Sequence, residues 1–127
     1  MVQFDDRMKK LFDEVDDYIE DRYGDIYPLH PVRPMRGETA NPEADGLFYV
    51  CANFTPGFGS EHGRGYLIDV KMSTLERVDE HVRREIYGAV AEKVEELLPL
   101  YFPDRELTVR RDKNHFKILG DLSLGEV

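Results

Sequence analysis

The sequence predicts an α+β fold, a two-layer sandwich in which two helices cover one face of a mostly antiparallel four-stranded sheet. Two long stretches repeat apolar residues every three or four positions, as on one face of a helix. Four short stretches are rich in aromatic and β-branched residues, as in strands, and they occur in two pairs. The resulting order, α-β-β-α-β-β, favours helices and sheet in separate layers. At 127 residues the chain suits one such unit, and we expect a single domain over residues 1–127.

The first helix is expected over about residues 3–23. Gly24 follows the last apolar position and is expected to end the helix in a left-handed conformation. The apolar face consists of Phe4, Met8, Leu11, Phe12, Val15, Tyr18, Ile19 and Tyr23.

The second helix is expected over about residues 80–98. Ser73 and Asp79 are both candidate N-cap residues, and Pro99 is expected to end the helix because it has no amide hydrogen to donate. Gly88, inside the helix, costs about 1 kcal/mol relative to alanine, which close packing against the first helix would explain. The apolar face consists of Val82, Ile86, Ala89, Val90, Val94, Leu97 and Leu98.

Two hairpins supply the sheet, the first from residues 47–55 and 66–72 and the second from residues 106–111 and 115–119. Alternation along the strands places these residues on the face that the helices cover: Phe48, Val50, Ala52, Phe54, Tyr66, Ile68, Val70, Met72, Leu107, Val109, Phe116 and Ile118. The other face then presents Tyr49, Cys51, Asn53, Leu67, Asp69, Lys71, Thr108, Arg110, His115 and Lys117. A helical connection makes the third strand parallel to the second. A sheet order of 2-1-3-4 would keep every neighbouring pair antiparallel, and this order is our expectation.

Charge and cysteine content restrict the class of protein. The net charge of −9 is concentrated on the two helices and disfavours binding to nucleic acid or to an anionic membrane. No apolar run approaches the roughly 20 residues that span a bilayer. A single cysteine, Cys51, excludes an internal disulfide and suits a cytoplasmic location. The four histidines are far apart in the sequence, so we expect no metal site and no cofactor.

The connection over residues 25–46 contains the least random feature of the sequence. Residues 28–36 read PLHPVRPMR, a proline–apolar–basic triplet written three times. In polyproline II, with three residues per turn, such a repeat lines each residue type along one stripe. Our favoured interpretation is a strap that buries Leu29, Val32 and Met35 against the fold and turns His30, Arg33 and Arg36 outward. A docking peptide for a partner and an anion-binding stripe are the alternatives.

No motif identifies an activity. The glycine-rich loop, residues 56–65, fits neither the dinucleotide nor the P-loop spacing, and it joins two strands instead of a strand and a helix. No pattern gives Cys51 or Ser60 a catalytic base, so we expect no catalytic residue. The tail, residues 120–127, is expected to lie loosely outside the fold.

Two functions therefore remain from the sequence. The first is a small acidic protein- or peptide-binding module, a possible homodimer, in which the open sheet face or an unpaired edge strand carries the contact. The second is a domain that binds an anion or small ligand, or acts on it, between the strap and the glycine-rich loop. The ligand-binding residues in that case would be Arg33, Arg36, His62 and Arg64.

Overall fold

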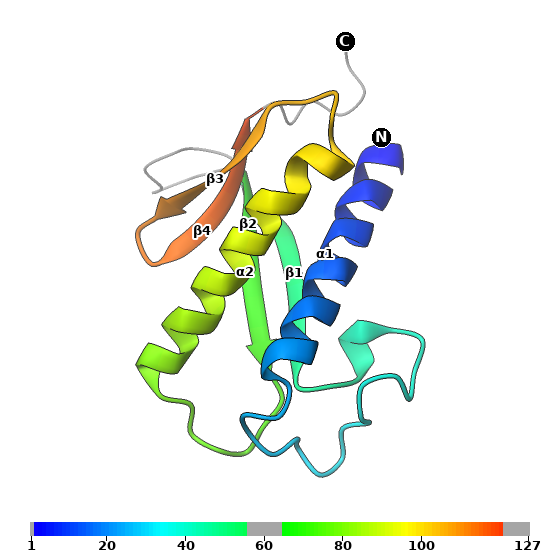
Figure 1. Cartoon of the computed structure of the whole chain (residues 1–127), viewed down its shortest axis with the longest axis vertical. Coiled ribbons are helices and arrows are strands. Elements are labelled where there is room, and N and C mark those ends of the chain that lie inside the picture. Colours follow the sequence, from blue (N-terminus) through cyan, green and yellow to red (C-terminus); the bar gives the residue numbers. More distant parts are fainter. Residues whose placement is uncertain (1, 56–64, 121–127) are drawn as a thin grey trace.

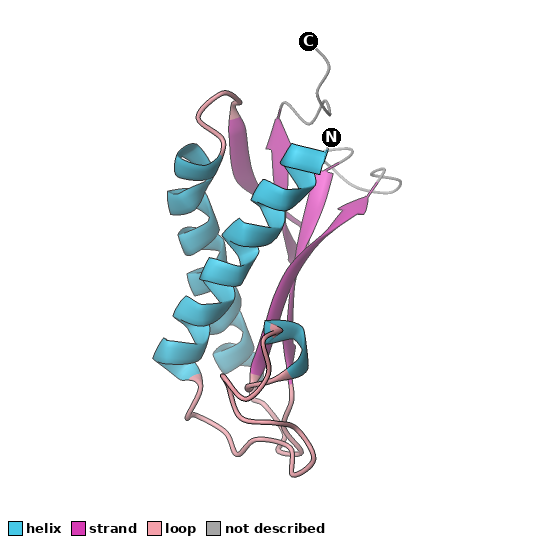
Figure 2. Cartoon of the chain, turned by 90° about the vertical axis from the view of Figure 1, so that its right-hand side faces the viewer, coloured by secondary structure: helices cyan, strands magenta, loops and turns pink. Residues whose placement is uncertain are grey.

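Four antiparallel strands form one sheet, and both long helices lie on the same side of it (Figures 1 and 2). The structure is a computed structural model that describes residues 2–55 and 65–120. Its elements are α1 (Val2–Tyr23), the 3-10 helix η1 (Pro42–Ala44), β1 (Phe48–Thr55), β2 (Gly65–Met72), α2 (Glu80–Tyr101), β3 (Leu107–Asp112) and β4 (His115–Gly120). The α+β class and the α-β-β-α-β-β order of the long elements are confirmed.

The strand order is β1-β2-β4-β3, so the expected order 2-1-3-4 is wrong. The second hairpin returns beside β2 and pairs through β4, which keeps all three neighbouring pairs antiparallel. The outer edge of β1 is taken by helix α1 instead. The carboxylates of Glu20 and Asp16 accept hydrogen bonds from the edge amides of Phe48 and Val50, which a further strand would need as donors.

The core lies between the two helices and the sheet, as the apolar spacing predicts. The fully buried side chains include Leu11, Val15, Ile19, Phe48, Ile68, Ile86, Val90, Leu98, Phe102 and Ile118. Burial of each contributes roughly 1.5–3 kcal/mol to folding. Two strand positions differ from expectation. Phe54 is 55% exposed because it lies near the end of β1, with its ring packed edge-on to Tyr66, and Lys117, expected on the open face, is only 3% exposed.

Helix α2 continues through Pro99 to Tyr101, so the proline does not end it. The last turn is held in the core by the buried residues Leu98 and Phe102, and the Phe102 amide donates to the Leu98 carbonyl at 2.8 Å. At the other end, Asp79 is the N-cap residue, although its side chain makes no capping hydrogen bond. Neither helix in the described part of the chain is long and apolar enough to cross a membrane.

Gly24, just after α1, and Gly88, inside α2, are not explained by the reasons expected from the sequence. Gly24 has no positive φ, but a Cβ there would overlap the carbonyl oxygen of Glu20. Glycine is therefore needed at position 24 because there is no room for a side chain, not because the backbone is left-handed. A Cβ at Gly88 would meet no atom within 4 Å, so close packing against α1 does not explain this residue.

Candidate functional site

The connection over residues 25–46 is attached to the fold by its arginines, the reverse of the strap expected from the sequence. Val32 is 83% exposed and Met35 66% exposed, and only Leu29 of the three apolar positions packs against the core. The reason is a turn in which the Arg33 amide donates to the carbonyl of His30 at 2.9 Å. This turn interrupts the three-residue period, so the stripes of a polyproline II helix do not form.

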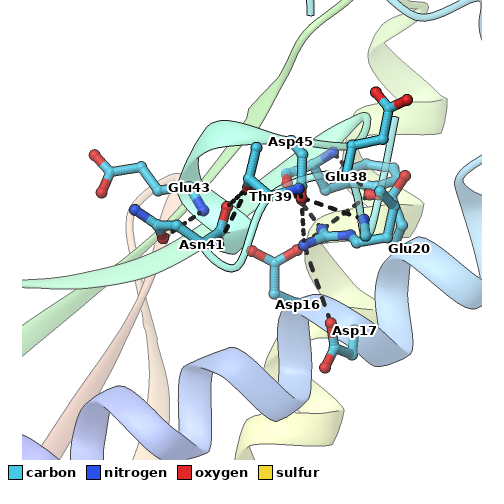
Figure 3. A network of polar contacts seen from close by, with 12 residues as sticks. Asp16, Asp17, Glu20, Glu38, Thr39, Asn41, Glu43 and Asp45 are labelled. Atoms are coloured by element: carbon cyan, nitrogen blue, oxygen red, sulfur yellow. Dashed lines mark hydrogen bonds and ion pairs between the residues drawn. The ribbon is translucent and has the colours of Figure 1, made fainter. Parts of the chain in front are cut away.

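Arg36 forms ion pairs with several carboxylates at once and is the centre of a polar network. Figure 3 shows the acidic side chains Asp16, Glu20 and Asp45 of this network. The Arg36 guanidinium contacts Asp16 and Glu20 of α1, the latter at 3.1 Å, and Asp45 of the connection at 3.3 Å. The same guanidinium donates to the carbonyl of Phe48, the first residue of β1, at 3.2 Å. One cation thus joins the helix, the connection and the edge strand.

The carboxylates of Asp16, Glu20 and Asp45 also bind main-chain amides. Asp16 accepts from Val50 at 3.1 Å, and Glu20 accepts from Leu47 at 2.9 Å and from Phe48 at 3.0 Å. Gly46, with φ of 79°, passes close beside Arg36 and Glu20, where a Cβ would lie only 2.9 Å from their side chains. The network therefore fixes both the path of the connection and the start of β1.

The electrostatics of the network favour an internal role. Burial raises the pKa of Asp16 to about 6, although the Val50 amide and the Arg36 guanidinium favour its charged form. Burial also opposes ionisation of Asp45, but hydrogen bonds from Thr39 and Gly37 outweigh it and lower the pKa of that carboxyl. With four carboxylates around one guanidinium, those of Asp16, Asp17, Glu20 and Asp45, an incoming anion would meet negative charge.

The structure places only part of the ligand site expected from the sequence. Arg36 is held in the network, and Arg33 donates to the carbonyls of Gly46 at 2.8 Å and Asp45 at 3.0 Å. His62 and Arg64 lie outside the described residues. Thr55 and Gly65 flank the glycine-rich loop at the end of β1 opposite Phe48, where the connection enters. The four-residue site therefore stays a prediction.

A cleft of about 380 Å³ opens elsewhere, between α2, β2 and the turn that joins β3 to β4. The β2–β4 register ends at Ile68, so the β3–β4 hairpin diverges from β2 beyond that residue. In Figure 1, α2 crosses in front of β2, and the hairpin lies to one side. The cleft is lined by Asp69, Val70, Met72, Glu80, Arg83, Arg84, Ile86, Tyr87, Arg111, Asn114 and His115. Three arginines and a histidine thus face two carboxylates, which makes the cleft locally basic on a chain of net charge −9.

The cationic side chains of the cleft differ in their contacts. The guanidinium groups of Arg83 and Arg84, in the first turns of α2, have no hydrogen-bond or ion-pair partner among the residues that the structure describes. Arg111 donates to the carbonyl of Lys113 at 3.2 Å. Arg83 and Arg84 are therefore the side chains of the cleft best placed to meet a ligand's negative charge.

Tyr87 lies at the inner end of the cleft, where the β2–β4 pairing stops. Its hydroxyl donates to the carbonyl of Ile68 at 2.5 Å and accepts from the amide of Phe116 at 3.0 Å. Ile68↔Phe116 is the last registered pair between the two strands. The hydroxyl thus stands between the Ile68 carbonyl and the Phe116 amide, and it keeps the two strands apart at the inner end of the cleft.

Sequence reasoning missed both the network and the cleft, although each leaves a signal. Asp16 occupies the apolar face of α1, four positions after Phe12 and three before Ile19, where an acid needs a buried partner. For the cleft, the signal is the pair Arg83–Arg84 at the start of an otherwise acidic helix. Among the described residues no three histidine, cysteine or carboxylate side chains are arranged to hold a metal ion.

Comparison with known proteins places the chain in a family. A protein family described as "Uncharacterised protein" matches residues 1–120, which include every helix and strand and the whole lining of the cleft. The chain belongs to this family. A relative from Borreliella burgdorferi, described as an uncharacterized protein, is 42% identical over 107 residues, 84% of each chain. No solved structure matches the chain.

Proposed function

We propose that the protein is a non-enzymatic binding module that captures an acidic protein or peptide in the cleft between α2, β2 and the β3–β4 turn. The observation that carries the proposal is the presence of Arg83, Arg84 and Arg111 in one cleft of a strongly acidic chain. A partner of opposite charge gains orientation and speed of association from such a site. The single cysteine suits a reducing compartment such as the cytoplasm.

The cleft also has the size and lining of a binding site. Its volume of about 380 Å³ lies within the roughly 300–1,000 Å³ of ligand pockets. Buried Ile86 and half-buried Val70 and Met72 supply an apolar floor, and charged groups stand around the rim. Apolar floors with a few convergent polar groups are typical of sites that bind, with or without a reaction.

The alternative, an anion site built from Arg33 and Arg36, has less support. Arg36 already contacts four carboxylates, and Arg33 already donates to two carbonyls. An anion would have to displace these contacts before it could bind.

The test is binding of a fluorescent octapeptide that alternates glutamate with valine, followed by anisotropy. We expect the double substitution Arg83→Glu and Arg84→Glu to weaken binding at least tenfold, and the affinity of the unchanged protein to fall as salt rises. Lys10→Glu is the matched control, because it reverses one charge on the exposed face of α1, away from the cleft. The single substitution Arg83→Glu is compared with Lys10→Glu, because both variants change the net charge by the same amount.

A peptide with glutamine in place of glutamate should bind at least tenfold more weakly. Equal affinities for both peptides, or an effect of Lys10→Glu as large as that of Arg83→Glu, would refute the proposed function.

A further inference from the structure

We infer that the partner binds as an extended acidic strand whose main chain pairs with the free edge of β2 at Val70 and Met72. This inference rests on the proposed function, since it specifies the ligand of the same cleft. It follows from the direction in which the main-chain groups of β2 point, from the place where β4 begins, and from the charge of the cleft walls.

The hydrogen bonds of β1 determine which way β2 points its main chain. The amides of Phe48 and Val50 donate to Glu20 and Asp16, so they turn away from β2. Their registered partners, Met72 and Val70, therefore belong to non-hydrogen-bonded pairs of the β1–β2 ladder. By the same alternation, the amide and carbonyl of Val70 and Met72 turn away from β1, towards the side on which β4 lies.

Strand β4 begins too late to pair with these groups. The β2–β4 register covers only Tyr66 to Ile68, and β4 starts at His115, directly after the turn. Within that turn, Lys113 adopts a φ of 59°, which reverses the chain tightly towards β3. The register therefore gives no β4 partner to Val70 or Met72, and both residues line the cleft.

An edge that offers donors and acceptors in alternation matches a peptide main chain. A phosphate group brings acceptors only and would leave the carbonyls of Val70 and Met72 without a donor. A long polyanion would also face Asp69 and Glu80 in the cleft walls. Addition of a strand to a free sheet edge satisfies both kinds of main-chain group, and side chains at alternate positions then give specificity.

The residues that line the cleft indicate which side chains the bound strand carries. One side of an added strand would face the apolar floor at Ile86, and the other would reach towards the rim. Arg83 and Arg84 stand on the α2 wall, and Arg111 and His115 stand at the hairpin. The ligand class is therefore an extended segment in which acidic residues alternate with apolar ones.

The first test is amide hydrogen exchange of the full chain, with and without the glutamate–valine octapeptide. We expect the amides of Val70 and Met72 to exchange at least tenfold more slowly when peptide saturates the protein. Ala52 is the matched control, because the same alternation turns its amide to the outer edge of β1. Unchanged exchange at Val70 and Met72 under saturating peptide would overturn the inference.

The second test uses octapeptides that carry a single N-methyl group at successive positions. Each methyl removes one main-chain donor, so affinity should fall at least tenfold at every second position and little at the positions between. A flat series, with binding still sensitive to Arg83→Glu, would leave the proposed function intact and overturn the strand geometry. Binding insensitive to Arg83→Glu would refute the proposed function itself.

A second copy of the chain is the competing occupant of this edge. In that case the amides of Val70 and Met72 would become protected as protein concentration rises without peptide, and light scattering would show a dimer. That result would overturn the inference of an acidic peptide ligand.

Discussion

Arg36 and Asp16 form an ion pair across twenty positions of sequence, and the Asp16 side chain is 1% exposed. The pair attaches the 25–46 connection to α1, while Val32 and Met35, two of the three apolar residues of the proline triplets, face solvent. Removal of one partner leaves a buried charge without compensation, which typically costs 3–5 kcal/mol.

We expect Arg36→Ala to lower the free energy of unfolding by about 3 kcal/mol, measured by urea titration near pH 8. Val32→Asp is the control on the same segment. Because Val32 is 83% exposed, its replacement should change stability by less than about 0.5 kcal/mol. A large loss from Val32→Asp together with a small one from Arg36→Ala would restore the apolar strap and contradict this arrangement.

Asp16 should also make stability depend on pH. Its pKa of about 6 in the folded protein lies above the ordinary value of 3.8, so the folded state holds a proton that the unfolded chain has released between these values. The stabilisation from this proton is complete below about pH 4 and is lost as pH rises through 6. Relative to Asp16→Asn, the unchanged protein should therefore lose on the order of 3 kcal/mol between pH 4 and pH 7.

Denaturant titrations of the two proteins across that range measure the effect. The difference between them should level off above pH 7, since Asp16 is then ionised in both states. A difference that stays constant from pH 4 to pH 7, or grows in favour of the unchanged protein, would show that the pKa of Asp16 is not raised.

Gly88→Ala should stabilise the protein by about 1 kcal/mol. An alanine Cβ at this position meets no atom within 4 Å, so the substitution gains helix propensity without a clash. Thermal unfolding of the variant measures the gain as a higher melting temperature. Destabilisation would mean that α1 and α2 approach each other more closely at Gly88 than the structure shows.

Tyr87→Phe tests the hydroxyl that separates β2 from β4. Its loss removes the partner of the Ile68 carbonyl and of the Phe116 amide, which should cost about 1–3 kcal/mol of stability. If the two strands close up and bond directly, the inner end of the cleft narrows and the glutamate–valine octapeptide binds more weakly. A variant with unchanged stability and unchanged peptide affinity would contradict the role given to this hydroxyl.

Local patterns predicted the fold class well, because each depends on one stretch of sequence. The spacing of Leu11, Val15 and Ile19 was enough to place α1 and its buried face. Strand order depends on which free edge receives the second hairpin, and that choice was decided by Asp16 and Glu20, whose contacts with β1 no local pattern shows.

The candidate site escaped prediction for a similar reason. Arg84 and His115 are thirty-one positions apart, and they meet only because the hairpin diverges from β2 at Ile68. The proline triplets led to a wrong prediction, that of a polyproline II strap with Val32 and Met35 buried. A regular repeat favoured one regular conformation, whereas the chain turns at His30–Arg33 and Arg36 pairs with Asp16 of α1.

Binding of an acidic peptide in the basic cleft is tested by mapping amide NMR shifts while the full chain is titrated with the glutamate–valine octapeptide. We expect saturable shifts concentrated at residues 69–72, 83–87 and 111–116, with the 28–46 connection and the outer edge of β1 unaffected. Shifts centred on Arg33 and Arg36 would favour the connection as the binding site. Such a result, or a titration that leaves the cleft residues unchanged, would contradict the claim that the basic cleft is where this protein binds its partner.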